Sequence, residues 1–267
     1  MSVPTQWPRG HSFFTPSPDG HHDPLIAGET IRQVGFLLAH AEFGVPLGNH
    51  FLMWDLSFTV EPEHLLVGSA PATLDISVTC TDITQRGARM SGFRIETVIR
   101  RNDRVAATGT GSFTCTSSAV YRRVRGSGID ADRGILPLSA PVSPQSVGRM
   151  SPIDVVLSPI GETDRWQLRI DTRHPVLFDH PVDHMPGMVL LEAARQATAA
   201  TPHRSSLMPL GVASTFSRYA ELDVPCLVEA HHRPGTVPGG EESVVVTGWQ
   251  DGETVFESVV TARPDEH

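Results

Sequence analysis

Two short segments of the sequence place a carboxylate, a guanidinium and an amide at helical spacing. They are Glu29-Thr-Ile-Arg32-Gln33 and Glu192-Ala-Ala-Arg195-Gln196. Residues three and four apart lie on one face of an α-helix, so each segment presents its polar groups together within an apolar stretch. A buried charge is costly unless it is paired. Each segment is therefore either a structural ion pair or a site in which the glutamate acts as a base and the arginine binds an anion.

The second segment is preceded by groups that suit acyl transfer. His180 and His184 precede the helix, and Pro186 and Gly187 lie at its start. Proline suits a first helical turn, and glycine lets a ligand approach the backbone. The free N–H groups of that helix end could hold a thioester oxygen that becomes negative, and a histidine could act as a base. A solvated loop histidine without a catalytic role is the alternative.

These patterns define the candidate site. We predict catalytic roles for Glu192, Glu29, His180 and His184, and substrate binding by Arg195, Arg32, Gly187, Gln196 and Gln33. The copy around Glu192 is favoured, because only that copy has the Pro-Gly pair at its helix start.

The two segments belong to an internal repeat. Glu192 follows Glu29 by 163 positions. The same offset, without a gap, aligns His11 with His174, His40 with His203, Pro46-Leu47-Gly48 with Pro209-Leu210-Gly211, and Pro62 with Pro225. Because five matches at one offset are improbable by chance, we interpret the chain as two copies of one module.

Each copy has the same order of predicted elements. A helix that is apolar on nearly every side comes first, over Leu25–Ala41 and Gly187–Ala200, and such a helix is buried all round. Predicted strands follow at 51–60, 73–82, 89–100 and 105–115, and in the second copy at 212–222, 228–232, 243–250 and 254–262. A long central helix wrapped by an antiparallel sheet is the arrangement that these elements allow, so the predicted fold class is α+β.

The predicted domains are a first module over residues 1–116, a linker over 117–150 and a second module over 151–267. The linker is rich in glycine and proline and shows little periodicity. A strand predicted over 153–158 has no counterpart in the first copy, because the offset places it ahead of Met1. The first module is therefore predicted to lack its first strand.

The composition excludes several classes of protein. Of the 267 residues, 39% are hydrophobic and 19% are charged, which indicates a globular protein. The net charge of −9 argues against a general nucleic-acid binder. The sequence has neither a secretory signal nor an apolar stretch of membrane-spanning length, and this predicts a cytoplasmic protein that does not bind membranes. The spacing of the three cysteines predicts neither a disulfide framework nor a metal site, and we expect no cofactor.

The segment from Met185 to Gln196 resembles the central-helix motif of β-hydroxyacyl-acyl-carrier-protein dehydratases of the hotdog fold. The catalytic glutamate of those dehydratases matches Glu192. Their catalytic histidine falls on Phe178 in gapless register, and His180 is two residues away. This departure argues against simple dehydration.

A wider set of motifs resembles the A-factor biosynthesis (AfsA-like) family over almost the whole chain. The motifs are Trp7-Pro-Arg-Gly-His11-Ser-Phe-Phe, Ala39-His-Ala-Glu-Phe-Gly-Val-Pro-Leu-Gly48, Phe51-Leu-Met-Trp-Asp-Leu-Ser-Phe58, Ser118-Ala-Val-Tyr-Arg-Arg123 and Arg173-His-Pro-Val-Leu-Phe-Asp-His-Pro-Val-Asp-His184. The resemblance implies a tandem double hotdog and an acyltransferase. That enzyme would join a β-ketoacyl group from acyl carrier protein to dihydroxyacetone phosphate during the synthesis of γ-butyrolactone-type signals that control antibiotic production.

The resemblance also implies roles for the candidate residues. A helix glutamate would accept the hydroxyl proton and an arginine would hold the phosphate. By analogy with dimeric hotdog enzymes, His180 or His184 is expected to face Glu29, and His11 or His22 to face Glu192. Two other functions stay open: a dehydratase or thioesterase acting on acyl thioesters, and a non-catalytic regulator that binds an acyl group or a lactone. The resemblance leaves a homodimer open as well.

Overall fold

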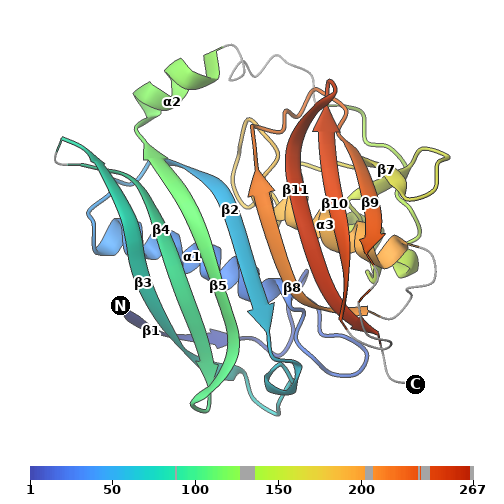
Figure 1. Ribbon diagram of the computed structural model, residues 1–267, viewed down its shortest axis with the longest axis horizontal. Helices are drawn as coiled ribbons and strands as arrows, with labels where there is room; N and C mark the ends of the chain where they lie inside the picture. Colours follow the sequence, from blue (N-terminus) through green and yellow to red (C-terminus); the bar gives the residue numbers. More distant parts are fainter. Residues whose placement is uncertain (88, 127–135, 202–206, 234, 236–240, 265–267) are drawn as a thin grey trace. The chain divides into compact units, whose positions relative to one another are not determined.

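The computed structural model describes residues 1–87, 89–126, 136–201, 207–233, 235 and 241–264, so the repeat match at His203 lies outside the described residues. The chain divides into two compact units (Figure 1). Unit 1 is Met1–Gly126 and unit 2 is Ser127–His267, and each is described by itself.

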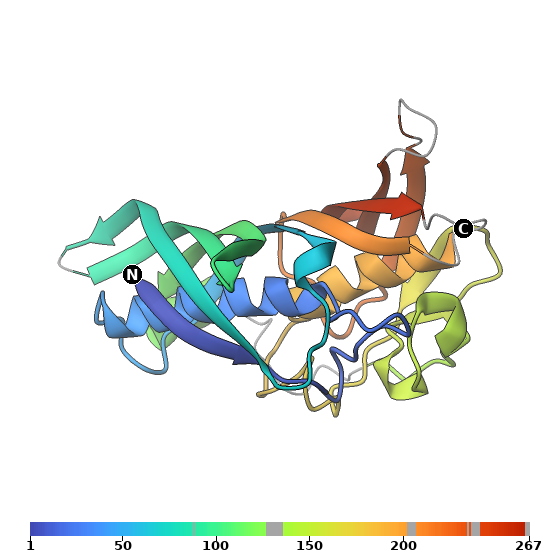
Figure 2. The ribbon, with the colours of Figure 1, turned by 90° about the horizontal axis from the view of Figure 1, so that it is seen from below.

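Unit 1 is an antiparallel sheet with one long helix across it. Its elements are β1 (Ser2–Trp7), α1 (Leu25–Ala41), β2 (His50–Val60), the 3₁₀ turn η1 (Pro62–His64), β3 (Ala72–Arg86), β4 (Arg89–Arg101), β5 (Arg104–Thr116) and α2 (Ser118–Arg125). The strands pair in the order β1-β3-β4-β5-β2. Helix α1 lies along one face of this sheet (Figures 1 and 2).

Unit 2 repeats this design around a second helix. Its elements are the 3₁₀ turns η3 (Pro144–Val147) and η4 (Pro152–Asp154), β6 (Leu157–Pro159), β7 (Arg165–Leu168), α3 (Gly187–Ala200), β8 (Leu207–Phe216), β9 (Leu227–Arg233), β10 (Glu242–Gln250) and β11 (Glu253–Pro264). The strands pair antiparallel in the order β8-β11-β10-β9-β7-β6.

The two units share one topology, as the repeat predicts. In each unit the strand after the helix pairs with the last strand, and the short strand before the helix pairs with the first strand of the following meander. β1 in unit 1 therefore corresponds to β7 in unit 2. Within the described part of the chain, only unit 2 adds a further edge strand, β6, beside that position.

Local sequence explains the main elements. In β3 the residues Ala72, Leu74, Ile76 and Val78 are buried and alternate with exposed neighbours, the pattern of a strand with one face on a core. The β4–β5 hairpin turns at Asn102 and Asp103, and the β10–β11 hairpin turns at Asp251 and Gly252; all four residues have positive φ. Two successive residues of positive φ are typical of the type I′ turn, which matches the twist of a hairpin.

Helix α1 packs close to its sheet at two glycines. A Cβ atom added at Gly28 would lie 2.9 Å from Cε1 of Phe58, and one added at Gly35 would lie 3.1 Å from Cδ1 of Ile95. Glycine at these positions lets the helix backbone approach the strands. The remaining face of α1 carries the polar segment that begins at Glu29.

Both central helices occupy the predicted ranges, but several other elements differ from the sequence predictions. β1 and β7 were not predicted, since both are short. The strand predicted over 153–158 is instead η4 followed by β6, and β8 ends at Phe216 although a strand was predicted to 222. The segment 117–150, predicted as a linker, contains α2 and η3. Its last residues contact α3, since Arg149 donates to Glu192 and Arg195 donates to the carbonyl oxygen of Val147. The glycine and proline content of the segment does not predict these contacts.

Candidate functional site

Glu192 in unit 2 lies at the centre of a fully buried ion cluster. Every residue of α3 from Met188 to Thr198 is buried, and Glu192 is 0% exposed. The Nε and Nη2 atoms of Arg195 donate to its two carboxylate oxygens at 2.9 and 2.7 Å. The Nε and Nη2 atoms of Arg149 donate to the same two oxygens at 2.7 and 2.6 Å. Two guanidinium groups therefore hold one carboxylate through two bidentate pairs.

These contacts make Glu192 a weak base. Burial by itself raises the pKa of a carboxyl group, but the charges of Arg149 and Arg195 and their hydrogen bonds outweigh burial and lower the pKa of Glu192 to about 2. A fifth hydrogen bond comes from Nε2 of Gln196. In this arrangement the carboxylate stays ionised and its lone pairs are largely occupied by the protein's own donors.

Gln196 connects this cluster to a second buried pair. Its Nε2 donates to the carbonyl oxygen of Asp154 at 2.7 Å, and its Oε1 accepts from the backbone N–H of Val156 at 3.0 Å. The Asp154 carboxylate lies 3.1 Å from Nε2 of His174, which is 3% exposed. The polar groups of unit 2 thus form one continuous network that ties the segment before β6 to helix α3.

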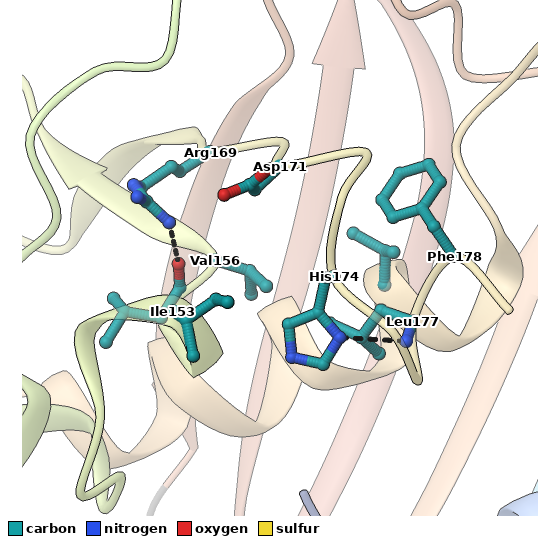
Figure 3. Close-up of a pocket in the computed structure, with 9 residues that line it drawn as sticks. Ile153, Val156, Arg169, Asp171, His174, Leu177 and Phe178 are labelled. Atoms are coloured by element: carbon teal, nitrogen blue, oxygen red, sulfur yellow. Dashed lines mark hydrogen bonds between the residues drawn. The ribbon is translucent and has the colours of Figure 1, made fainter.

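A small pocket borders this network (Figure 3). Its lining is mostly apolar, with Arg169, Asp171 and His174 as polar members. Arg169 donates to the carbonyl oxygens of Ser139 and Val155 at 3.0 Å each, and burial lowers its pKa. Asp171 is paired with the exposed Arg173. Arg169 is therefore a buried cation that, among the described residues, has no carboxylate within ion-pair distance.

In the matching segment of unit 1, Glu29 accepts fewer hydrogen bonds than Glu192 does in unit 2. Arg32 donates to Glu29 through Nε at 2.8 Å and Nη2 at 2.7 Å, and Gln33 donates at 2.6 Å. The Glu29 side chain is 15% exposed. No other described residue of unit 1 donates to Glu29, so this carboxylate accepts three hydrogen bonds where Glu192 accepts five.

The repeat also places one histidine in each unit in the same local setting. Nδ1 of His174 accepts the backbone N–H groups of Val176 and Leu177 at 3.2 and 3.0 Å. Nδ1 of His11 accepts those of Phe13 and Phe14 at 3.1 and 3.0 Å. Because Nδ1 is an acceptor in both, the neutral ring carries its proton on Nε2.

The predicted loop histidines lie in different settings. His180 is 65% exposed, and its Nδ1 lies 2.6 Å from the Asp179 carboxylate. His184 is partly buried; its Nδ1 lies 2.8 Å from Asp183 and its ring packs against Tyr219. Gly187 is the first residue of α3, directly after Pro186, as predicted.

The structure thus brings together Glu192, Arg195 and Gln196 in unit 2, and Glu29, Arg32 and Gln33 in unit 1. Sequence reasoning missed Arg149 and Asp154, which have no counterpart at the repeat offset, and Arg169, whose counterpart is the uncharged Gln6. His174 was detectable, since the repeat aligns it with His11.

In the described part of the chain, no group of histidine, cysteine or acidic side chains is arranged to hold a metal ion. The described helices include none that is long and apolar enough to cross a membrane.

Comparison with known proteins identifies the family. The A-factor biosynthesis hotdog domain matches residues 1–117 and 131–264. The chain belongs to the A-factor biosynthesis hotdog family. A member from Streptomyces virginiae, a 2-oxo-3-(phosphooxy)propyl 3-oxoalkanoate synthase, is 52% identical over 98% of this chain and 88% of its own length. A synthase of the same name from Streptomyces griseus is 42% identical over 98% of this chain and 86% of its own length.

The hotdog fold is shared with solved structures of remote sequence. A Lactobacillus plantarum protein assigned as an oleoyl thioesterase matches with a TM-score of 0.63 at 12% identity, covering 100% of this chain and 98% of that one. This likeness confirms the predicted α+β double hotdog. In this chain each of the two units is one such module, with α1 as the central helix of unit 1 and α3 as that of unit 2.

Proposed function

We propose that the protein transfers a 3-oxoacyl (β-ketoacyl) group from an acyl carrier protein thioester to the hydroxyl group of dihydroxyacetone phosphate. The observation that carries this proposal is the 52% identity, over 98% of the chain, to a 2-oxo-3-(phosphooxy)propyl 3-oxoalkanoate synthase. That name describes the ester of a 3-oxoalkanoic acid with dihydroxyacetone phosphate. Family membership supports a role for this ester in the synthesis of γ-butyrolactone-type signals.

The reaction requires three kinds of group. The hydroxyl oxygen attacks the thioester carbonyl carbon, the C–O bond forms, the C–S bond breaks, and the hydroxyl proton passes through a base to the leaving thiolate. A carboxylate suits the base, a hydrogen-bond donor stabilises the negative oxygen, and a guanidinium suits the phosphate. The two helix segments supply Glu192 and Glu29 as candidate bases and Arg195 and Arg32 as candidate phosphate ligands.

Mass spectrometry of the product tests the proposal. We expect the full chain, incubated with 3-oxoacyl carrier protein and dihydroxyacetone phosphate, to form the phosphorylated ester and free carrier protein thiol. Without dihydroxyacetone phosphate, we expect no turnover. Release of the free 3-oxo acid in both reactions would instead identify a thioesterase, and binding of the acyl group without turnover would identify a regulator.

The arginine predicted to hold the phosphate can be tested by a conservative change. Lysine keeps the charge but loses the planar fork of Arg195 or Arg32. We expect one of Arg195→Lys and Arg32→Lys to raise the apparent KM for dihydroxyacetone phosphate roughly ten-fold, with an unchanged KM for the acyl carrier protein. Circular dichroism of both variants controls for folding. If neither KM changes, the phosphate is bound elsewhere, and Arg169 is then the next candidate.

A further inference from the structure

The duplicated site is not equivalent in the two units. In unit 2 every polar group of the repeated set has an internal partner: Glu192 accepts five hydrogen bonds, and Nε2 of His174 meets the Asp154 carboxylate. In unit 1 the same set is incomplete. Glu29 accepts three hydrogen bonds, and Nε2 of His11 has no hydrogen-bond partner among the described residues.

His11 lies within electrostatic range of two carboxylates of unit 1, Asp23 and Glu29. In unit 2 the corresponding residues, His174 and Glu192, are joined by a short chain of hydrogen bonds. His174 contacts the Asp154 carboxylate, and Gln196 donates to the Asp154 carbonyl oxygen and to Glu192. In unit 1, Nε1 of Trp7, four residues before His11, donates to Thr30, the residue after Glu29. Partial burial lowers the pKa of His11, while the charges of Asp23 and Glu29 act to raise it. The Glu29 carboxylate therefore lies within electrostatic range of the imidazole.

We propose that unit 1 holds the acyl-transfer centre, with Glu29 as the general base and His11 as the donor that stabilises the thioester oxygen. This inference rests on the proposed function. The dihydroxyacetone phosphate hydroxyl gives its proton to Glu29 as its oxygen bonds to the thioester carbon. Nε2–H of His11 donates to the carbonyl oxygen as that oxygen becomes negative. The C–S bond then breaks and the proton passes from Glu29 to the thiolate.

Glu29 accepts fewer hydrogen bonds than Glu192, and this difference is the physical basis for placing the general base in unit 1. A base must have a lone pair that is accessible to the substrate and must accept a proton at moderate cost. Glu192, fully buried between Arg149 and Arg195 with a pKa of about 2, meets neither condition. Glu29 has one guanidinium partner, and its side chain is 15% exposed. A neutral His11 whose Nδ1 is held by two backbone N–H groups presents a fixed Nε2–H donor.

Matched substitutions at the equivalent positions of the two units test the inference. Asparagine places an oxygen near the position of Nδ1, so His11→Asn keeps an acceptor for the N–H groups of Phe13 and Phe14 but removes the Nε2–H donor. We expect Glu29→Gln and His11→Asn to lower kcat at least about 100-fold, with circular dichroism spectra and thermal midpoints close to those of the wild type. His174→Asn is the control, and we expect it to change kcat less than about three-fold.

Binding provides a second readout that does not depend on turnover. We expect a 3-oxoacyl pantetheine thioether, measured by calorimetry, to bind His11→Asn several-fold more weakly than the wild type and to bind His174→Asn normally. Wild-type protein that forms no ester would contradict the proposed function alone, and the binding comparison would still decide the location of the site. Folded Glu29→Gln with kcat within ten-fold of the wild type, or equal binding by both asparagine variants, would overturn the inference.

Discussion

Glu192→Ala is expected to lower the free energy of unfolding by about 3–5 kcal/mol, because it leaves the buried guanidinium groups of Arg149 and Arg195 without their shared carboxylate. For a protein of this size, such a loss corresponds to a fall of roughly 10 °C in thermal midpoint. The measurement is urea unfolding followed by circular dichroism, supported by calorimetry.

Glu29→Ala is the matched control at the equivalent helix position. The Glu29 side chain is 15% exposed and its carboxylate pairs with one arginine, so the expected loss is only about 1 kcal/mol. Equal losses from the two alanine variants would show that the Arg149 contact does not distinguish the two units. A smaller loss from Glu192→Ala than from Glu29→Ala would contradict the structural role of the buried cluster.

The low pKa of Glu192 predicts a specific acid sensitivity. Its folded-state pKa of about 2 lies below its ordinary value of 4.5, so the folded protein binds this proton less readily than the unfolded chain. The resulting stabilisation, about 3 kcal/mol, is fully present above pH 4.5 and is lost as the pH falls toward 2. The measurement is the free energy of unfolding at a series of pH values between 7 and about 2.

Glu192→Gln isolates this effect, because glutamine does not titrate while every other carboxyl group is unchanged. The stability difference between wild type and Glu192→Gln should shrink by most of the 3 kcal/mol as the pH falls from about 5 to about 2. Asp19 and Asp171, whose pKa values are also lowered, titrate equally in both proteins and cancel in the difference. Parallel pH curves for the two proteins would refute the assignment.

The two copies of the repeated segment now differ in how their glutamates are bonded. Duplication copied a histidine and a Glu-x-x-Arg-Gln segment into both halves, and the unit 2 copy is now bonded internally by residues that lie outside the repeat. A carboxylate held in this way stabilises its helix and balances the charge of two buried guanidinium groups. With Glu29 as the proposed base, the unit 2 copy of the segment stabilises the fold and the unit 1 copy carries out the chemistry.

Sequence alone determined the features that depend on residues close together in the chain. The two central helices were predicted at Leu25–Ala41 and Gly187–Ala200, because apolar composition and helical spacing are local. The bonding of Glu29 with Arg32, and of Glu192 with Arg195, follows from the same spacing. The repeat predicted one topology for both halves, and the family motifs implied the reaction class.

Tertiary structure alone decided how the two copies differ. Arg149 lies 43 positions before Glu192 and Asp154 lies 20 positions before His174, and no periodicity connects residues so far apart. Their contacts form only when the segment before β6 folds against α3. The basicity of a carboxylate depends on how many charges and donors surround it after folding and on how much water it retains. For this reason, the same Glu-x-x-Arg-Gln motif gives different carboxyl groups in the two units. Glu192 accepts five hydrogen bonds and has a pKa of about 2, whereas Glu29 accepts three hydrogen bonds and its side chain is partly exposed.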